Sequence, residues 1–188
     1  VMAHDLGLSM TAFTDACSAA MLELARDPRV IFLGQNVCYP GHTIYDTLRG
    51  IPDDRKIELP VFEDTQMGIS TGLALAGFVP VTCYPRIDFL LLAMNQLVLH
   101  LDKLGKMSQG QLQPKVIVRT MLGANYPLDP GPQHNGNYVH SLRQMLTYTP
   151  VMVAATPEAV PGVYRQAMGL ECPVVVVEID QDKRSEYR

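Results

Sequence analysis

The chain has 188 residues, of which 47% are hydrophobic and 18% are charged, and this length fits one domain with its own hydrophobic core. Charged residues usually make up about a quarter of a soluble domain, so the low share here suggests that part of the surface faces another chain. The 15 basic and 19 acidic residues give a net charge of −4, which disfavours binding to nucleic acid or to an anionic membrane surface.

Targeting and membrane signals are weak in this sequence. The longest apolar run, Phe89–Met94, is too short to cross a bilayer. The first residues lack the basic region and apolar core of a signal peptide, so we expect none. The cysteines form no C-x-x-C pair, as is typical of reduced thiols in a cytoplasmic protein; they are Cys17, Cys38, Cys83 and Cys172. We therefore expect a cytoplasmic protein.

Helical and strand-like segments alternate from the N-terminus onward. Ser9 or Thr11 can cap a helix that has one apolar face as far as Leu24. Pro28 ends this helix, and Val30–Leu33 is expected to form a buried strand.

The next three segments include a helix of unusual composition. Lys56–Phe62 is expected to form a short strand that Pro60 interrupts, and Val79–Tyr84 forms the following strand. Between them, Met67–Ala76 is a predicted helix built mostly from small residues. Because each glycine lowers helix stability by about 1 kcal/mol, we expect the backbone of a neighbour to pack tightly against this helix.

The second half of the chain continues the alternation. Asp88–Met107 is expected to form one long amphipathic helix with Asp88 as its cap, and Lys115–Arg119 a buried strand. Gly123–Gly136 holds three prolines and three glycines, which predicts an irregular loop, and loops of this length in compact domains are usually functional. The remaining segments are expected to be helix, strand, helix and strand, at Tyr138–Tyr148, Val151–Ala155, Pro157–Leu170 and Pro173–Ile179.

Continuous apolar strands separated by helices predict a parallel sheet that is covered on both faces. The expected fold class is therefore α/β, a three-layer αβα arrangement around a mostly parallel sheet. The sequence shows no internal repeat or linker, so we expect a single domain over residues 1–188 with its core at about residues 11–179.

Ligands of open parallel sheets bind beyond the carboxyl ends of the strands, which makes the residues after each strand candidates. Glu63 precedes the helix of small residues, where the helix dipole favours an ionised carboxylate, although it can equally be a helix cap. His134 lies in the long loop, where the residues alone favour a solvated side chain over a functional one. Arg119 can bind a substrate anion or be structural. The other histidines show no metal-ligand spacing, so we expect no metal site on this chain.

Several separated motifs follow one another along the chain, and their order is more informative than any one of them. The stretch FEDTQMGISTGLALAGFVPVTCYPRIDF holds a glutamate, a helix of small residues, Gly-x-x-Pro, a strand and an Asp-Phe pair. ARDPRVIFLGQNV precedes it, and KMSQGQLQPKVIVR and GPQH follow. Together these motifs, from about Thr11 to Glu178, resemble thiamine-diphosphate enzymes of the transketolase type, in particular the beta subunit of the decarboxylating component of 2-oxoacid dehydrogenase complexes. The matching positions are Glu63, Gly68, Gly72, Gly77, Pro80, Asp88, Phe89 and His134.

The resemblance implies that the chain is a pyrimidine-binding domain that holds thiamine diphosphate. Glu63 would be catalytic and cofactor-binding, because the family's glutamate hydrogen-bonds N1′ of the aminopyrimidine ring and so promotes removal of the C2 proton of the thiazolium ring. Phe89 would stack on the pyrimidine. His134 would be catalytic, approaching the substrate or its adduct and stabilising developing charge.

The resemblance also implies a partner chain. The diphosphate group and its Mg²⁺ need a Gly-Asp-Gly…Asn signature that this sequence lacks, so an alpha-type, diphosphate-binding subunit is expected to supply them, with two copies of each chain. The C-terminal domain of the family's beta chains is also absent from this sequence. We therefore expect half of a split enzyme that self-associates and acts on a small keto substrate, either by 2-oxoacid decarboxylation with acyl transfer or by ketol transfer.

Departures from the family pattern, which include the proline-rich loop Met121–Pro130, leave alternatives open. Gly34-Gln35-Asn36 stands where the family often has Gly-Glu-Asp, so two negative charges are lost, and Thr65 stands where a glycine is common. One alternative is a non-catalytic assembly or regulatory subunit that retains the fold. The other is a fragment of a longer beta subunit.

Overall fold

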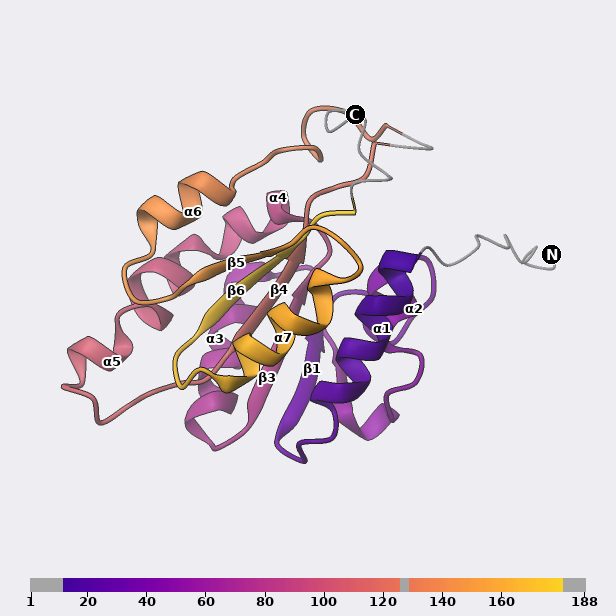
Figure 1. Cartoon of the computed structure of the whole chain (residues 1–188). Coiled ribbons are helices and arrows are strands. Elements are labelled where there is room, and N and C mark those ends of the chain that lie inside the picture. The colour runs from indigo at the N-terminus through magenta and orange to yellow at the C-terminus, as the bar shows by residue number, and fades with distance from the viewer. Residues whose placement is uncertain (1–11, 126–128, 181–188) are drawn as a thin grey trace.

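The computed structural model describes residues 12–125 and 129–180, and these form a six-stranded sheet between two layers of helices (Figure 1). The sheet order is β2-β1-β3-β4-β6-β5, and every neighbouring pair is parallel. The predicted α/β three-layer fold is therefore confirmed. The strands are β1 (Val30–Gly34), β2 (Lys56–Glu58), β3 (Val79–Tyr84), β4 (Ile117–Met121), β5 (Val151–Ala154) and β6 (Val174–Glu178).

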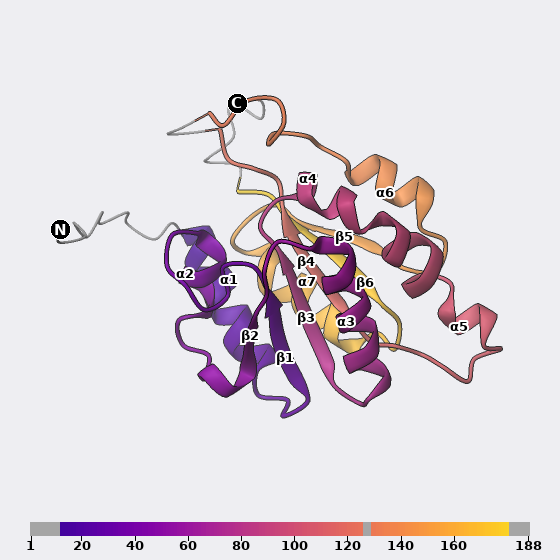
Figure 2. The same ribbon diagram turned by 180° about the vertical axis from the view of Figure 1, so that it is seen from behind.

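The helices divide between the two faces of the sheet, as Figures 1 and 2 show from opposite sides. One buried cluster joins α1, α2 and α7 to the sheet, and the other joins α3, α4 and α6. Alternate valines of β6 belong to different clusters, so both faces of this strand are buried. Val174 and Val176 lie in the first cluster, and Val175 and Val177 lie in the second. The helices are α1 (Ala12–Leu24), α2 (Thr43–Leu48), α3 (Glu63–Leu75), α4 (Ile87–Leu90), α5 (Leu104–Met107), α6 (Val139–Met145) and α7 (Ala159–Gly169).

The predicted long helix over Asp88–Met107 is wrong as a single element. After α4 the chain forms a 3₁₀ turn at Leu91–Ala93 and a π-helical segment at Asn95–Leu101 before α5 begins. The wider π turn keeps residues four apart, Leu97 and Leu101, on the buried side. Asp88 is not the cap, because the N-cap position belongs to Arg86.

The second strand is shorter than predicted, since β2 covers three residues and ends at Glu58. Both carboxylate oxygens of Glu58 turn toward the loop after β1 and accept hydrogen bonds from the backbone N–H groups of Asn36, Val37 and Cys38, each at 2.8 Å. Pro60 has no N–H with which to continue the ladder. The sequence did not predict α2 or the 3₁₀ turn at residues 53–55.

The other predicted elements are found within one to three residues of their expected ends at most boundaries. The described part of Gly123–Gly136 contains no helix or strand, as predicted, while residues 126–128 lie outside the described residues. The predicted caps at Ser9 and Thr11 also lie outside them.

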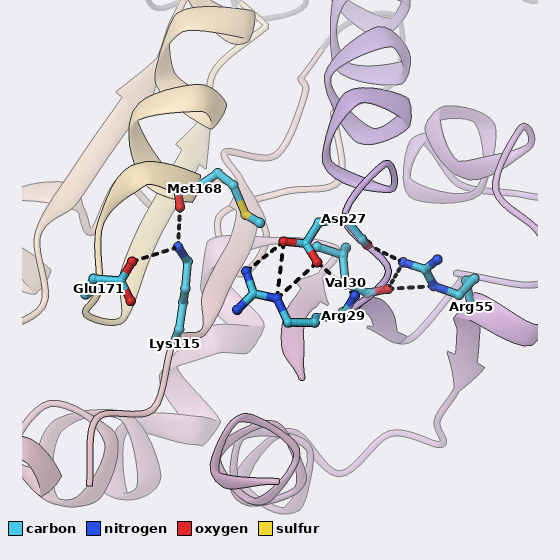
Figure 3. A network of polar contacts seen from close by, with 7 residues as sticks. All are labelled: Asp27, Arg29, Val30, Arg55, Lys115, Met168 and Glu171. Carbon is cyan, nitrogen blue, oxygen red and sulfur yellow. Dashed lines mark hydrogen bonds and ion pairs between the residues drawn. The ribbon is translucent and has the colours of Figure 1, made fainter. Parts of the chain in front are cut away.

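Polar contacts close the amino-terminal edge of the sheet (Figure 3). The guanidinium of Arg55 donates hydrogen bonds to the backbone carbonyls of Asp27, at 2.7 Å, and Val30, at 2.8 Å. The Asp27 carboxylate pairs with Arg29 at 2.7 Å, and Lys115 donates to a carbonyl at the end of α7. These contacts stabilise the ends of β1, α1 and α7, so we interpret the amino-terminal edge as structural. The candidate functional residues are therefore sought at the opposite, carboxyl edge of the sheet.

Candidate functional site

Glu63 lies at the carboxyl edge as the first residue of α3, and its side chain is only 5% exposed. The N-cap position belongs to Phe62, and among residues 12–125 and 129–180 no backbone N–H of α3 donates to the Glu63 carboxylate. The helix-cap interpretation of Glu63 is therefore not what the structure shows. Its carboxylate accepts one long hydrogen bond, from Gln35 Nε2 at 3.3 Å. Its backbone carbonyl accepts a hydrogen bond from the Tyr84 hydroxyl at 3.0 Å, which fixes the start of α3 against β3.

The end of β1 approaches β3 closely enough to present Gln35 to Glu63. Gly34 has φ +139°, and a Cβ there would lie 2.3 Å from the Cys83 carbonyl oxygen and 2.9 Å from Gln66 Nε2. Only glycine fits this position without displacing its neighbours. Gln66 is fully buried one turn after Glu63 and donates to the Cys83 carbonyl at 3.0 Å.

Phe89 and His134 meet although 45 positions separate them in the chain. Their rings lie edge to face, with centroids 5.6 Å apart and planes at 86°. Two bonds hold the His134 loop against α4: Arg86 Nη1 donates to the His134 carbonyl at 3.0 Å, and the Gly136 N–H donates to Asp88 Oδ1 at 3.0 Å. Asp88 thus anchors the loop that carries His134, which explains why it does not cap α4.

Several buried polar atoms around these residues make no hydrogen bond within the described part of the chain. A buried polar atom without a partner is costly, so such a group points to a bound polar ligand or water. The atoms are Asp64 Oδ1 and Gln66 Oε1 on α3, Asp88 Oδ2 on α4 and Nδ1 of His134.

The structure thus brings Glu63 together with Gln35, and Phe89 together with His134. Among the described residues no hydrogen bond or ring contact joins the first pair to the second, although both lie at the same edge of the sheet. Sequence reasoning missed Gln35 as a contact of Glu63 and treated Asp88 as a cap. The signal that points to Asp88 is its position in the first turn of the helix that follows β3, as Glu63 lies in the first turn of the helix that follows β2.

Arg119 is structural, and its interpretation as a substrate-binding residue is wrong. Its side chain is fully buried and donates to both carboxylate oxygens of Glu178, at 2.8 and 3.1 Å, and to Thr47 Oγ1 at 2.9 Å. Tyr164 donates its hydroxyl to the same carboxylate at 2.5 Å. Burial alone would lower the pKa of Arg119, but the Glu178 carboxylate outweighs burial and holds that pKa well above its usual value. This network fastens α2 and α7 to the sheet.

Metal and membrane features can be assessed over residues 12–125 and 129–180. Within these ranges no group of three or more histidine, cysteine, aspartate or glutamate side chains could hold a metal ion. In the same part of the chain, no helix combines the length and apolar character needed to cross a bilayer.

Comparison with known proteins gives one family. Residues 9–184 match the model described as "Transketolase, pyrimidine binding domain". The chain is 29% identical over 160 residues to the chloroplastic pyruvate dehydrogenase E1 component subunit beta-3 of Arabidopsis thaliana, covering 83% of this chain and 38% of that protein. It is 28% identical over 186 residues to the 3-methyl-2-oxobutanoate dehydrogenase subunit beta of Mycobacterium tuberculosis, covering 95% and 51%. The chain therefore spans about half or less of the length of these relatives.

Solved structures share the fold. One, described as "Split gene transketolase, inactive beta4 tetramer", superimposes with a TM-score of 0.68 at 17% identity, over 87% of this chain and 49% of that chain. The transketolase from Leishmania mexicana superimposes with a TM-score of 0.67 at 16% identity, over 87% and 24%.

Proposed function

Because the chain belongs to the family of transketolase pyrimidine-binding domains, we propose that it supplies the pyrimidine-binding half-site of a thiamine-diphosphate-dependent enzyme. The single observation that carries this proposal is the buried Glu63 carboxylate at the carboxyl edge of the sheet, which accepts a long hydrogen bond from Gln35 at 3.3 Å. We also propose that residues 1–188 are one pyrimidine-binding domain, which the match over residues 9–184 supports.

The residues at this edge fit an aminopyrimidine ring. Such a ring has both hydrogen-bond donors and acceptors and an aromatic face. Glu63 has capacity for a further hydrogen bond, and Phe89 is half-buried with its ring beside His134. The unpartnered oxygens of Asp64, Gln66 and Asp88 add acceptors in the same region. The donor set is therefore compatible with the ring that the family binds.

Each side chain has a distinct role in this proposal. When bound, thiamine diphosphate supplies the nucleophilic carbon that attacks a keto group and holds the electron pair released on cleavage. Glu63 holds a proton shared with ring nitrogen N1′ in a site that excludes water, where a carboxyl group and a ring nitrogen can exchange it. Phe89 offers a surface for the ring to pack on. His134 donates a hydrogen bond or a proton at the carbonyl oxygen of the substrate, where negative charge develops.

The proposed enzyme needs a second chain for the diphosphate group and Mg²⁺. The names of the two relatives describe beta subunits, and one structural neighbour is described as a split-gene transketolase, which supports a heteromeric assembly. Exposed apolar side chains on α3 and the segments beside it also favour association with this partner or with a second copy. They are Leu75, Phe78, Leu92 and Leu99.

Co-purification from the native source tests this proposal. The chain is isolated under mild conditions, and mass spectrometry identifies partner chains and any released cofactor. Recovery of a diphosphate-binding subunit with thiamine diphosphate and magnesium is the expected result. Recovery of the chain alone, without cofactor, contradicts it and favours the non-catalytic subunit or the fragment of a longer beta subunit. Turnover of a 2-oxoacid or of a ketose phosphate by the recovered complex then decides between decarboxylation with acyl transfer and ketol transfer.

A further inference from the structure

Arg86 lies at the carboxyl edge of the sheet, close to the Phe89–His134 pair. It is the N-cap residue of α4, directly after β3, and its side chain is half-buried between α4 and the His134 loop. Nη1 donates to the His134 carbonyl at 3.0 Å. The guanidinium also lies over Gly123, where a Cβ would be only 2.0 Å from Nη1. These contacts fix the orientation of the guanidinium within the candidate site.

One donor of this guanidinium has a defined partner among the described residues. An arginine side chain carries five N–H donors in a planar fork, and the His134 carbonyl takes one of them. Within the described part of the chain, no carboxylate forms an ion pair with Arg86. Asp88 is near enough to influence it but instead accepts a hydrogen bond from Gly136. Arg119, by contrast, has a buried carboxylate that receives two of its donors.

Arg86 carries its positive charge in a half-buried environment. Burial lowers the pKa of Arg86 and outweighs the opposing effect of Asp88. Burial also lowers the pKa of the neighbouring His42, to about 4, and the positive charge of Arg86 lowers it further in the same direction. Gln35 and Asn36 in the loop after β1 are themselves neutral, and the carboxylates of Glu63 and Glu58 accept hydrogen bonds from this loop.

We propose that Arg86 binds the anionic group of the keto substrate, a carboxylate or a phosphate, beside the Phe89–His134 pair. A guanidinium fork can present two parallel N–H donors to two oxygens of either group. This inference rests on the proposed function for the identity of the reacting molecule, but it assigns the oxyanion contact to this chain rather than to the partner.

Nuclear magnetic resonance of the full chain tests the contact directly. The ¹⁵N–¹H signal of Arg86 Nε is assigned by its loss in Arg86→Lys, and the signal of the exposed Arg26, at the end of α1, is the control. The chain is titrated with sodium pyruvate and with inorganic phosphate at constant ionic strength, and with uncharged methyl pyruvate. A saturable shift of the Arg86 signal with either anion, without one for Arg26 or with methyl pyruvate, is expected, and the anion that produces it identifies a carboxylate or a phosphate site. Absence of a saturable shift with both anions, or the same shift with chloride, overturns the proposal.

Steady-state kinetics of the complex with its partner separate this inference from the proposed function. Loss of a charge-assisted hydrogen bond in Arg86→Gln should raise KM for the anionic substrate by about 10- to 100-fold, with a much smaller change in kcat. Arg86→Lys should recover part of the loss, and Arg26→Gln should leave both constants unchanged. An active complex whose KM is unaffected by Arg86→Gln refutes the role of Arg86. A wild-type complex that turns over no keto substrate instead contradicts the proposed function, and the titration then decides on Arg86.

Discussion

The buried pair of Arg119 and Glu178 gives a quantitative test of the packing. The side chains are 0% and 2% exposed, and the guanidinium donates two hydrogen bonds to the carboxylate, at 2.8 and 3.1 Å. Arg119→Met leaves the Glu178 carboxylate buried with the Tyr164 hydroxyl still donating to it. Removing one partner of a buried ion pair costs about 3–5 kcal/mol. We expect a loss of about 3 kcal/mol here, because Tyr164 continues to satisfy one oxygen.

Urea unfolding measures this loss as a change in the free energy of unfolding, and thermal unfolding measures it as a change in Tm, both followed by circular dichroism. Since 1 kcal/mol shifts Tm by about 2–4 °C in a chain of this size, Arg119→Met should lower Tm by about 6–12 °C. The double variant Arg119→Met/Glu178→Leu should be less destabilised than the sum of the single variants, because it leaves no uncompensated charge. Arg26→Met is the exposed control and should change the free energy of unfolding by less than about 0.5 kcal/mol. A loss below about 1 kcal/mol for Arg119→Met, or additive single variants, would refute the reasoning.

Three further outcomes follow from the geometry. Gly123→Ala should destabilise the chain, since a Cβ would lie 2.0 Å from Arg86 Nη1. Gly162→Ala in α7 is the control, because its Cβ meets open space, and it should stabilise the chain by about 0.5–1 kcal/mol. Equal effects of the two variants in urea unfolding would contradict this expectation. The pKa of His42 is lowered to about 4 by burial and by Arg86, so the unfolded chain, with a histidine pKa of about 6.5, takes up the proton first as the pH falls. Stability should therefore be full above about pH 6.5 and decline toward about pH 4, and His42→Asn, which keeps a capping side chain, should flatten that decline; an unchanged pH profile in the variant would count against it. A Cβ at Gly72 on α3 would meet nothing within 4 Å in the described chain, so Gly72→Ala should stabilise the isolated chain. If a partner chain or a second copy packs against this face of α3, the added methyl group should weaken that association in sedimentation analysis. Unchanged association would show that the face of α3 around Gly72 is not an interface.

The strands were predictable because their signal is local. β3 matches its predicted bounds, and β6 is a run of valines between Pro173 and the polar C-terminal residues. The break of the helix after Asp88 into several short helical segments could not be predicted from the sequence. Three consecutive leucines define no single apolar face, and which of them is buried depends on packing against the rest of the fold. The shortened β2 has a similar cause, since Glu58 bonds a loop 20 to 22 residues away.

The residues of the candidate site could be predicted from the sequence only in part. Glu63, Phe89 and His134 could be selected from their motifs and from positions after strands, and the structure places all three at the carboxyl edge. Their neighbours could not, because Gln35 reaches Glu63 across 28 positions and Arg86 reaches the His134 carbonyl across 48. Contacts of this kind depend on the order of strands in the sheet, which no local pattern encodes.

The central claim is that Glu63 activates thiamine diphosphate in a site shared with a partner chain. The most direct measurement is the rate at which the C2 hydrogen of thiamine diphosphate exchanges for deuterium in the complex, followed by nuclear magnetic resonance after acid quench, in the wild type and in Glu63→Gln. We expect fast exchange in the wild type and a loss of about 100-fold or more in Glu63→Gln, as for removal of a group that transfers a proton, with the cofactor still bound and Tm preserved. Exchange at the wild-type rate in Glu63→Gln would contradict it.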